Sequence, residues 1–171
     1  NFLISREKSF FSDHSSLNKI INDNKFIESY SLAKLKSFNP NIFNCCDKHR
    51  MYIEIIQNTN KDIKEGAVFN ETGIIGQVVN NKSFHEVMLL TDTKSSIPLT
   101  NSKGDFYCNA SGSGASDYIT CSYSQLVWLD NHELGEKFFS SGLGGIYPKG
   151  IEIGNLESIQ TLDPSTTLLT I

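Results

Sequence analysis

Gly66-Ala-Val-Phe-Asn-Glu-Thr-Gly-Ile-Ile-Gly76 is one copy of a glycine-spaced unit that returns later in the chain as Gly135-Glu-Lys-Phe-Phe-Ser-Ser-Gly-Leu-Gly-Gly145. The three glycines, the phenylalanine and the aliphatic residue after the second glycine keep the same spacing in both copies. This spacing predicts a strand, a tight turn that needs a positive φ, and a second strand whose backbone closely approaches a neighbour. A repeated unit of this kind indicates two similar β modules.

Short segments rich in Ile, Val, Phe, Tyr and Thr surround both copies, and clusters of Gly, Asn, Asp and Ser separate these segments. Such alternation is typical of strands and turns. In one segment, Met51, Ile53 and Ile55 would share a face of the strand. Because no helix-length pattern lies between the strands, the body is predicted to be all-β, either a sandwich or small barrels. The expected strands are 28–37, 51–57, 74–80, 86–91, 97–100, 105–110, 117–123, 126–129, 137–140 and 151–159.

Residues 1–27 are expected to form an N-terminal helical segment, in which a short helix runs to about Asn24 and Ser12 or Asp13 caps its start. Two interpretations stay open: a terminal helix packed on the body of the chain, or the last turns of a coiled coil. Because the chain begins with Asn1 rather than methionine, it is expected to come from the middle of a longer protein. The apolar positions at helical spacing are Leu17, Ile20, Ile21 and Ile27.

Composition limits the class of protein. The 171 residues carry a formal net charge of −4, and 39% of them are hydrophobic, which excludes a disordered chain. No basic run could neutralise a series of phosphates, so no nucleic-acid partner is expected. No segment approaches the roughly 18 consecutive apolar residues of a membrane-spanning helix, and no signal peptide is visible. The expected domains are the helical segment 1–27, a first β-barrel over 28–100 and a second over 101–171, and it stays open whether C-terminal strands join the first barrel.

Cys108 and Cys121 flank a predicted hairpin. With Gly114-Ala115 as a two-residue type II′ turn, Cys108 would lie directly opposite Cys121 in a non-hydrogen-bonded pair. A disulfide is geometrically allowed at such a position. The alternatives are two buried thiols, or a turn shifted to Gly112-Ser113, which would break this register.

Motifs of metal and catalytic sites are not found. Cys45-Cys46-Asp47-Lys48-His49 lacks the second spaced pair that a structural zinc site needs, so a loop is the favoured interpretation. His85-Glu86 and His132-Glu133 lack a second histidine at metalloprotease spacing. No catalytic residue, metal site or cofactor is therefore predicted.

The segment Ser140-Ser-Gly-Leu-Gly-Gly-Ile-Tyr-Pro-Lys-Gly-Ile-Glu-Ile-Gly154 resembles the signature of MreC, the family of bacterial rod shape-determining proteins. Upstream, Lys64–Val79 is similar to the family's first-barrel motif, and Val87–Asp92 and Ser96–Leu99 are similar to its next two strands. The resemblance covers about residues 50–160 in the family's order. It does not include the Cys- and Asn-rich loop 39–50.

The resemblance implies a non-enzymatic scaffold of the cell-elongation machinery. MreC proteins have a short cytoplasmic end, one transmembrane helix, a dimerising coiled coil and two small β-barrels. The implied fold is therefore mainly β, with two small β-barrel domains after a short N-terminal helix, the remnant of that coiled coil. A single-pass anchor upstream of Asn1 would place this part at the periplasmic face of the bacterial inner membrane, where an oxidising compartment favours the Cys108–Cys121 disulfide.

The resemblance also implies the partners. These are the elongation-specific penicillin-binding transpeptidase, which the scaffold would position for peptidoglycan synthesis, then MreD, RodA and cytoplasmic MreB filaments, and a second copy in a homodimer or filament. A runner-up function is a periplasmic β-barrel module that binds a glycan or peptidoglycan ligand.

The functional residues of a scaffold are exposed apolar patches or sheet edges. Bulky apolar residues in the glycine-rich turn after Ser140 would contact a partner, because chain reversal tends to leave such tips exposed. An alternative is that Leu143 and Ile146 fill the barrel interior. The candidate partner contacts are Leu143, Ile146, Tyr147 and Pro148, and the candidates for self-association are Leu17, Ile20 and Ile27.

Overall fold

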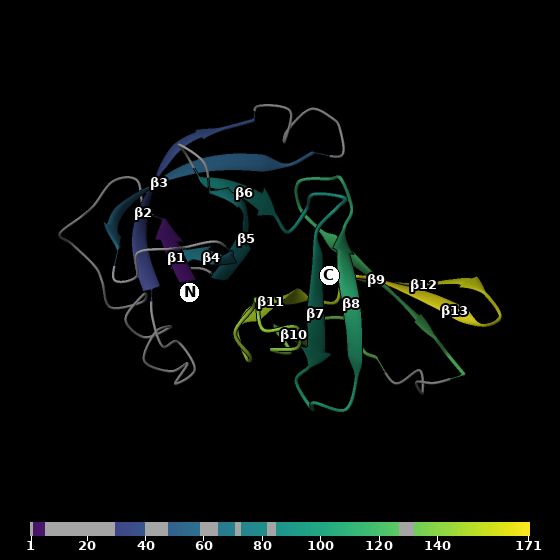
Figure 1. The fold of residues 1–171 in the computed structure, drawn as a ribbon. Helices are drawn as coiled ribbons and strands as arrows, with labels where there is room; N and C mark the ends of the chain where they lie inside the picture. Colours follow the sequence, from purple (N-terminus) through teal and green to yellow (C-terminus); the bar gives the residue numbers. More distant parts are fainter. Residues whose placement is uncertain are drawn as a thin grey trace.

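The computed structural model describes residues 2–5, 30–39, 48–58, 65–70, 73–81, 85–126 and 132–171, which form two β-sheets (Figure 1). No helix occurs within these ranges, so the mainly β fold predicted from the sequence is confirmed. The expected helix after Ser12, with Leu17, Ile20 and Ile27, lies outside the described residues.

The first sheet is a closed barrel of six strands in the order β1-β2-β3-β6-β5-β4. It closes because β1 pairs in parallel with both β2 and β4. Ile53, Val68, Val78 and Val87 fill its interior together with Met51 and Ala33, and Ile55 packs against this cluster, as the shared face predicted for the strand requires. The strands are β1 (Phe2–Ser5), β2 (Tyr30–Phe38), β3 (Arg50–Asn58), β4 (Gly66–Asn70), β5 (Gly73–Asn81) and β6 (His85–Leu89).

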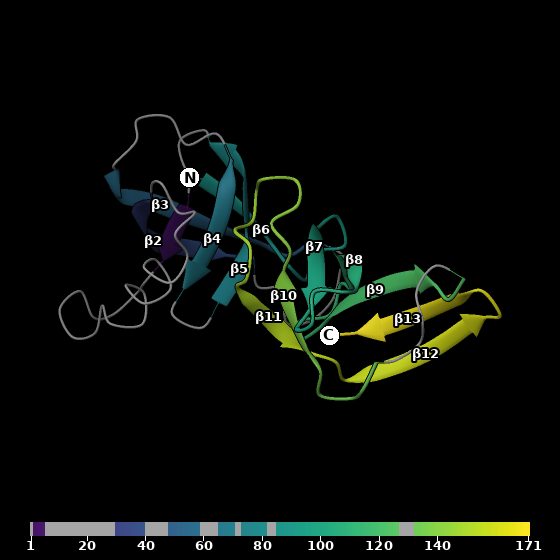
Figure 2. The same ribbon diagram turned by 90° about the horizontal axis from the view of Figure 1, so that it is seen from below.

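The sequence predicted a second β-barrel; among the described residues, the second sheet is antiparallel and does not close, and its strand order is β11-β10-β7-β8-β9-β13-β12. Figure 2 shows why: β9, β13 and β12 extend away from the first barrel, while β11 lies at the opposite end beside β5. The strands are β7 (Ser96–Asn101), β8 (Tyr107–Gly112), β9 (Ile119–Ser124), β10 (Lys137–Ser140), β11 (Glu152–Asn155), β12 (Ser158–Asp163) and β13 (Thr166–Thr170).

Two predicted boundaries need correction. Phe2–Ser5, expected in the helical segment 1–27, is a strand of the first barrel. Strand β7, expected within the first barrel at 28–100, instead pairs with β8 and β10 in the second sheet. Among the described residues, no C-terminal strand joins the first barrel. The division between the two sheets therefore falls at residues 90–95.

The two copies of the repeated unit fold differently after their strands. In the first copy β4 and β5 form a hairpin, and Gly76 approaches β6 so closely that an added Cβ would lie 2.1 Å from the carbonyl oxygen of Met88. In the second copy Gly142 and Gly145 adopt positive φ values of 80° and 72°. The chain then forms a loop, and β11 begins at Glu152, close to the start of the strand expected at 151–159.

A common apolar core joins the two sheets. Val68 of β4 points into the barrel, whereas its neighbours Ala67 and Phe69 belong to a second cluster that also contains Ile97 and Leu99 of β7. Strand β4 is therefore buried on both faces, which explains why Ala67, Val68 and Phe69 are apolar in succession. The second sheet covers one outer face of the first barrel and fixes the two units against each other.

Candidate interaction surface

The loop between β10 and β11 contains the four residues predicted to contact a partner, and these residues differ in how far they are exposed to solvent. Leu143 is 57% exposed, Ile146 is partly buried, and Pro148 is buried. Tyr147 is only 3% exposed and lies in the core shared by the two sheets. The expectation that the whole tip is exposed is thus wrong for Tyr147 and Pro148, because the loop folds back onto the first barrel.

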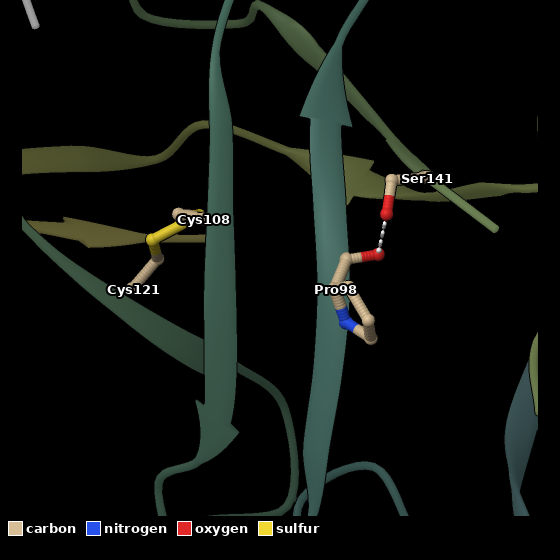
Figure 3. Close-up of a disulfide and its surroundings, with 4 residues drawn as sticks. All are labelled: Pro98, Cys108, Cys121 and Ser141. Atoms are coloured by element: carbon tan, nitrogen blue, oxygen red, sulfur yellow. Dashed lines mark hydrogen bonds between the residues drawn. A yellow bond between two sulfur atoms is a disulfide. The ribbon is translucent and has the colours of Figure 1, made fainter. Parts of the chain in front are cut away.

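Two serines hold this loop in place. The Oγ of Ser141 donates to the carbonyl oxygen of Pro98 on β7 at 3.1 Å (Figure 3). The backbone N–H of Ser141 donates to the same oxygen at 2.9 Å. The Oγ of Ser140, which is fully buried, donates to the carbonyl of Pro148 and accepts the N–H of Ile151 at 3.0 Å. Both ends of the loop are therefore pinned by hydrogen bonds, and Leu143 is presented from a rigid base.

Tyr147 ties the loop to the first barrel. Its hydroxyl donates to Oε1 of Gln77 on β5 at 2.8 Å. Burial raises the pKa of the Tyr147 phenol above its ordinary value, so the hydroxyl stays protonated and remains a donor. The aromatic ring packs into the common core, and the side chain therefore positions the loop instead of contacting solvent.

A hollow of about 290 Å³ lies where the loop meets the start of β4. Glu65 and Gly66 line one side, and Gly144, Gly145 and Ile146 line the other. The would-be Cβ positions of Gly144 and Gly145 face open space. With Leu143 exposed in the same loop, this hollow is suited to receive a protruding side chain of another protein.

A buried ionic cluster, which sequence reasoning did not single out, fixes the connection between the sheets. The fully buried carboxylate of Asp92 lies 2.7 Å from Nε of Arg50 and accepts the backbone N–H groups of His49 and Lys94, each at 2.9 Å. Glu86 lies 3.6 Å from the same guanidinium. In the sequence, Arg50 is the first residue of β3 and Asp92 lies three residues after the end of β6, so no motif links the two charges.

The structure joins Cys108 of β8 and Cys121 of β9 in a disulfide with an S–S distance of 2.07 Å and a Cα–Cα distance of 6.3 Å (Figure 3). The predicted register is nevertheless wrong, because Ala110 and not Cys108 lies opposite Cys121. Cys108 lies two residues further along the same strand face, so the bridge runs diagonally across the hairpin.

Within the part of the chain that the structure describes, no three His, Cys, Asp or Glu side chains come together in a way that could hold a metal ion. Cys45 and Cys46 lie outside the described residues. His49 is buried, with its Nδ1 2.8 Å from the hydroxyl of Thr91. Nδ1 of His132 lies 2.8 Å from Oε2 of Glu136, and the ring packs edge-on against Phe106, so both histidines pack within the fold and do not line a cleft.

The described residues include no helix of the length and hydropathy needed to cross a bilayer.

The arrangement of two β units with a pinned, exposed loop can be compared with known proteins. A sequence model of one family, described as "Rod shape-determining protein MreC, barrel core", matches residues 42–171, which is most of the chain. The chain belongs to the MreC family. The resemblance noted in the sequence is thereby confirmed, and it now extends to the C-terminal residue.

Characterised MreC proteins are similar in sequence. The cell shape-determining protein MreC of Haemophilus influenzae is 32% identical over 112 residues, which cover 62% of this chain and 31% of that protein. MreC of Escherichia coli is 26% identical over 116 residues, covering 67% of this chain and 31% of that protein. The chain thus spans about a third of the length of these relatives.

Solved MreC structures share the fold. MreC from Pseudomonas aeruginosa superposes with a TM-score of 0.59 at 22% identity and covers 81% of this chain and 87% of its own. MreC in a complex with the penicillin-binding protein PBP2 from Helicobacter pylori gives a TM-score of 0.58 at 17% identity, covering 81% and 83%. At these identities the likeness shows the common architecture.

Proposed function

We propose that this chain is the folded part of a non-catalytic scaffold of the cell-elongation machinery, and that it binds and positions the elongation-specific penicillin-binding transpeptidase. Membership of the MreC family carries the proposal. A solved complex in which an MreC protein of the same fold is bound to PBP2 supports the choice of partner.

The surface proposed for this partner is the pinned loop after β10. Leu143 supplies an exposed apolar contact, and the hollow beside Ile146 can take up a side chain of the transpeptidase. Tyr147 and Pro148 are buried under the loop and hold it against the first barrel. Because the loop is fixed before binding, little conformational entropy is lost on association.

The rest of the assembly follows from the family. A single-pass anchor upstream of Asn1 would hold this part at the periplasmic face of the inner membrane. Self-association through Leu17, Ile20 and Ile27 would give a homodimer or filament, and MreD, RodA and MreB would complete the complex.

Recovery of partners from cells tests this function. The full-length protein is purified from detergent-solubilised envelopes, in its natural form and with Leu17, Ile20 and Ile27 all replaced by Ser, because deleting residues 1–27 would remove strand β1 from the closed barrel. The proposal predicts that the elongation-specific transpeptidase copurifies with both forms, because the binding loop lies in the second sheet. Retention on peptidoglycan without any transpeptidase would contradict the scaffold and favour the glycan-binding alternative.

A further inference from the structure

The outward face of the second sheet is unusually free of charge. Strands β7, β8, β9 and β13 contain no charged residue, although 20% of the whole chain is charged. Charged residues normally occupy exposed positions. Inward residues of these strands form the core, so the lack of charge on the outward side is not explained by burial.

Hydroxyl groups form a continuous row across this face. The strand register places Ser96 opposite Ser111, Ser111 opposite Thr120, Thr120 opposite Thr170, and Thr170 opposite Ser158. None of these five side chains is buried. With neighbouring strands about 4.8 Å apart, the row is about 19 Å long.

The next row along the strands is also neutral. It contains Asn109 of β8, Ser122 and Leu168, which are directly opposite each other, and Gln160 of β12. Tyr107, 37% exposed, lies on the same face two residues from Asn109. Together the two rows present hydroxyl and amide groups, each able to donate and accept, with one aromatic ring at the margin.

Charged side chains on this face are confined to its two edges. Lys137 of β10 and Glu152 of β11 lie beyond β7 and pair with each other at 2.9 Å. Asp163 of the edge strand β12 lies opposite Thr166 at the far end of the face. The central strands therefore present no cation to attract phosphate or carboxylate groups. They also lack the Arg, Trp and Met side chains typical of protein–protein contacts, in which Ser is depleted.

We infer that this face, defined by the Ser96–Ser158 row and the adjacent Asn109–Gln160 row, binds an extended neutral glycan with N-acetylated sugars. A flat surface of paired donors and acceptors matches a chain of sugar hydroxyl and acetamido groups, and the neutrality of the face matches a ligand without charge. The ring of Tyr107 can stack on the apolar face of a sugar. This inference is independent of the proposed binding of a transpeptidase, since it uses other residues.

Titration with chitohexaose, a neutral chain of six N-acetylglucosamine units, tests the inference on the 171-residue chain. Nuclear magnetic resonance is used to follow backbone amide shifts in the natural sequence, in Ser122→Lys, and in the matched control Ser37→Lys. Ser37 is likewise an exposed strand serine, but on β2 of the first barrel. Thermal melting checks that both variants fold.

The expected result is that chitohexaose shifts amides of β8, β9 and β13, and that Ser122→Lys weakens binding at least about tenfold while Ser37→Lys does not. No shift at millimolar sugar, or equal affinity in all three proteins, would overturn the inference. The inference would also be overturned if the protein showed no response to sugar and Ser122→Lys abolished its self-association, because the face would then bind a second copy of the chain. Loss of transpeptidase binding in Ser122→Lys, again without a response to sugar, would assign it to that protein and leave the proposed function standing.

Discussion

Asp92 illustrates how one buried side chain holds two sheets together. Its carboxylate accepts hydrogen bonds from the backbone N–H of His49, just before β3, and of Lys94, in the connector that leads to β7. It also neutralises the charge of Arg50, whose side chain is only 11% exposed. A buried carboxylate with this many partners is costly to disturb, because a lost partner leaves a desolvated charge.

We expect Asp92→Asn to lower the free energy of unfolding by about 3 kcal/mol, since the buried Arg50 would keep only the more distant carboxylate of Glu86, at 3.6 Å, as a counter-ion. Urea denaturation followed by tryptophan fluorescence measures the change. The matched control is Glu152→Gln, which removes the charge of an exposed pair with Lys137 and should cost about 0–1 kcal/mol. Equal losses for the two substitutions would show that the cluster does not fix the connector.

Tyr147 provides a second prediction at this scale. Tyr147→Phe removes the hydroxyl that donates to Gln77 and should lower the free energy of unfolding by about 1 kcal/mol. Combining it with Gln77→Ala should add less than the sum of the single effects, because both changes break the same bond. Tyr107→Phe, at an exposed tyrosine, serves as the control and should have almost no effect. Strict additivity would argue against the bond between loop and barrel.

The spacing of the glycines in the repeated unit predicted a close approach of two strands, and a substitution of Gly76 tests this prediction. Alanine there would place Cβ 2.1 Å from a backbone oxygen of β6, so Gly76→Ala should lower the free energy of unfolding by about 3 kcal/mol. Gly154→Ala is the control, because its Cβ would meet the Cγ2 methyl of Ile171 at 3.2 Å and the backbone carbon of that residue at 3.7 Å, so a shift of a few tenths of an ångström relieves the contact. Equal melting temperatures of the two variants would contradict the close approach of β5 and β6 at Gly76.

At the scale of elements, the strands were largely predictable and their pairing was not. The alternation of apolar, β-branched segments with turn-forming clusters predicted the positions of β2, β3 and β5 to β10 to within a few residues. The hairpin register was missed because tertiary contacts set it: Gly112 packs on the backbone of Asp92, and Gly114 donates to the carbonyl of Thr91. A preference for a two-residue turn cannot reveal such contacts.

The C-terminal hairpin shows a different limit. Residues 151–159, expected as one strand, are divided between β11 and β12, and β13 was not expected at all. Its turn is stabilised by Asp163, whose carboxylate accepts the N–H and the hydroxyl of Ser165 at 2.8 and 2.7 Å. The signal was Asp163-Pro164-Ser165, a typical turn sequence. Of the strand expected at 126–129, Leu126 lies in a turn and the other residues lie outside the described part of the chain.

The disulfide belongs to this scale because it links two strands. Replacing both cysteines, as Cys108→Ser with Cys121→Ser, should lower the free energy of unfolding by about 3 kcal/mol, mainly by freeing a short loop in the unfolded chain. Thermal melting with and without reductant measures the effect. The natural protein should melt lower when reduced, and the double variant should not respond. An unchanged melting temperature on reduction would contradict a stabilising role for the disulfide.

At the scale of the whole molecule, the shared core explains why the site was only partly predictable. The glycine-rich loop was located correctly from the sequence, and Leu143 is exposed as expected. Burial of Tyr147 depends on Phe69 and Ile74 of the first barrel, which are distant in sequence and meet the loop only after both sheets have packed. Periodicity within one segment carries no information on such packing.

The shared core also has a functional consequence. A partner that binds the loop after β10 contacts a surface whose position relative to the first barrel is fixed by apolar packing and by the bond from Tyr147 to Gln77. Under the proposed function, this fixed position would hold a bound transpeptidase in a defined orientation relative to the first barrel.

The affinity of the chain for the purified elongation-specific transpeptidase of the same organism tests this account most directly. Surface plasmon resonance is used to compare the natural chain with Leu143→Glu and with Leu134→Glu, a control at another exposed leucine in the turn before β10. The account predicts binding by the natural chain, at least about tenfold weaker binding by Leu143→Glu, and no loss for Leu134→Glu. Absence of binding by the natural chain, or equal affinity of all three proteins, would contradict it.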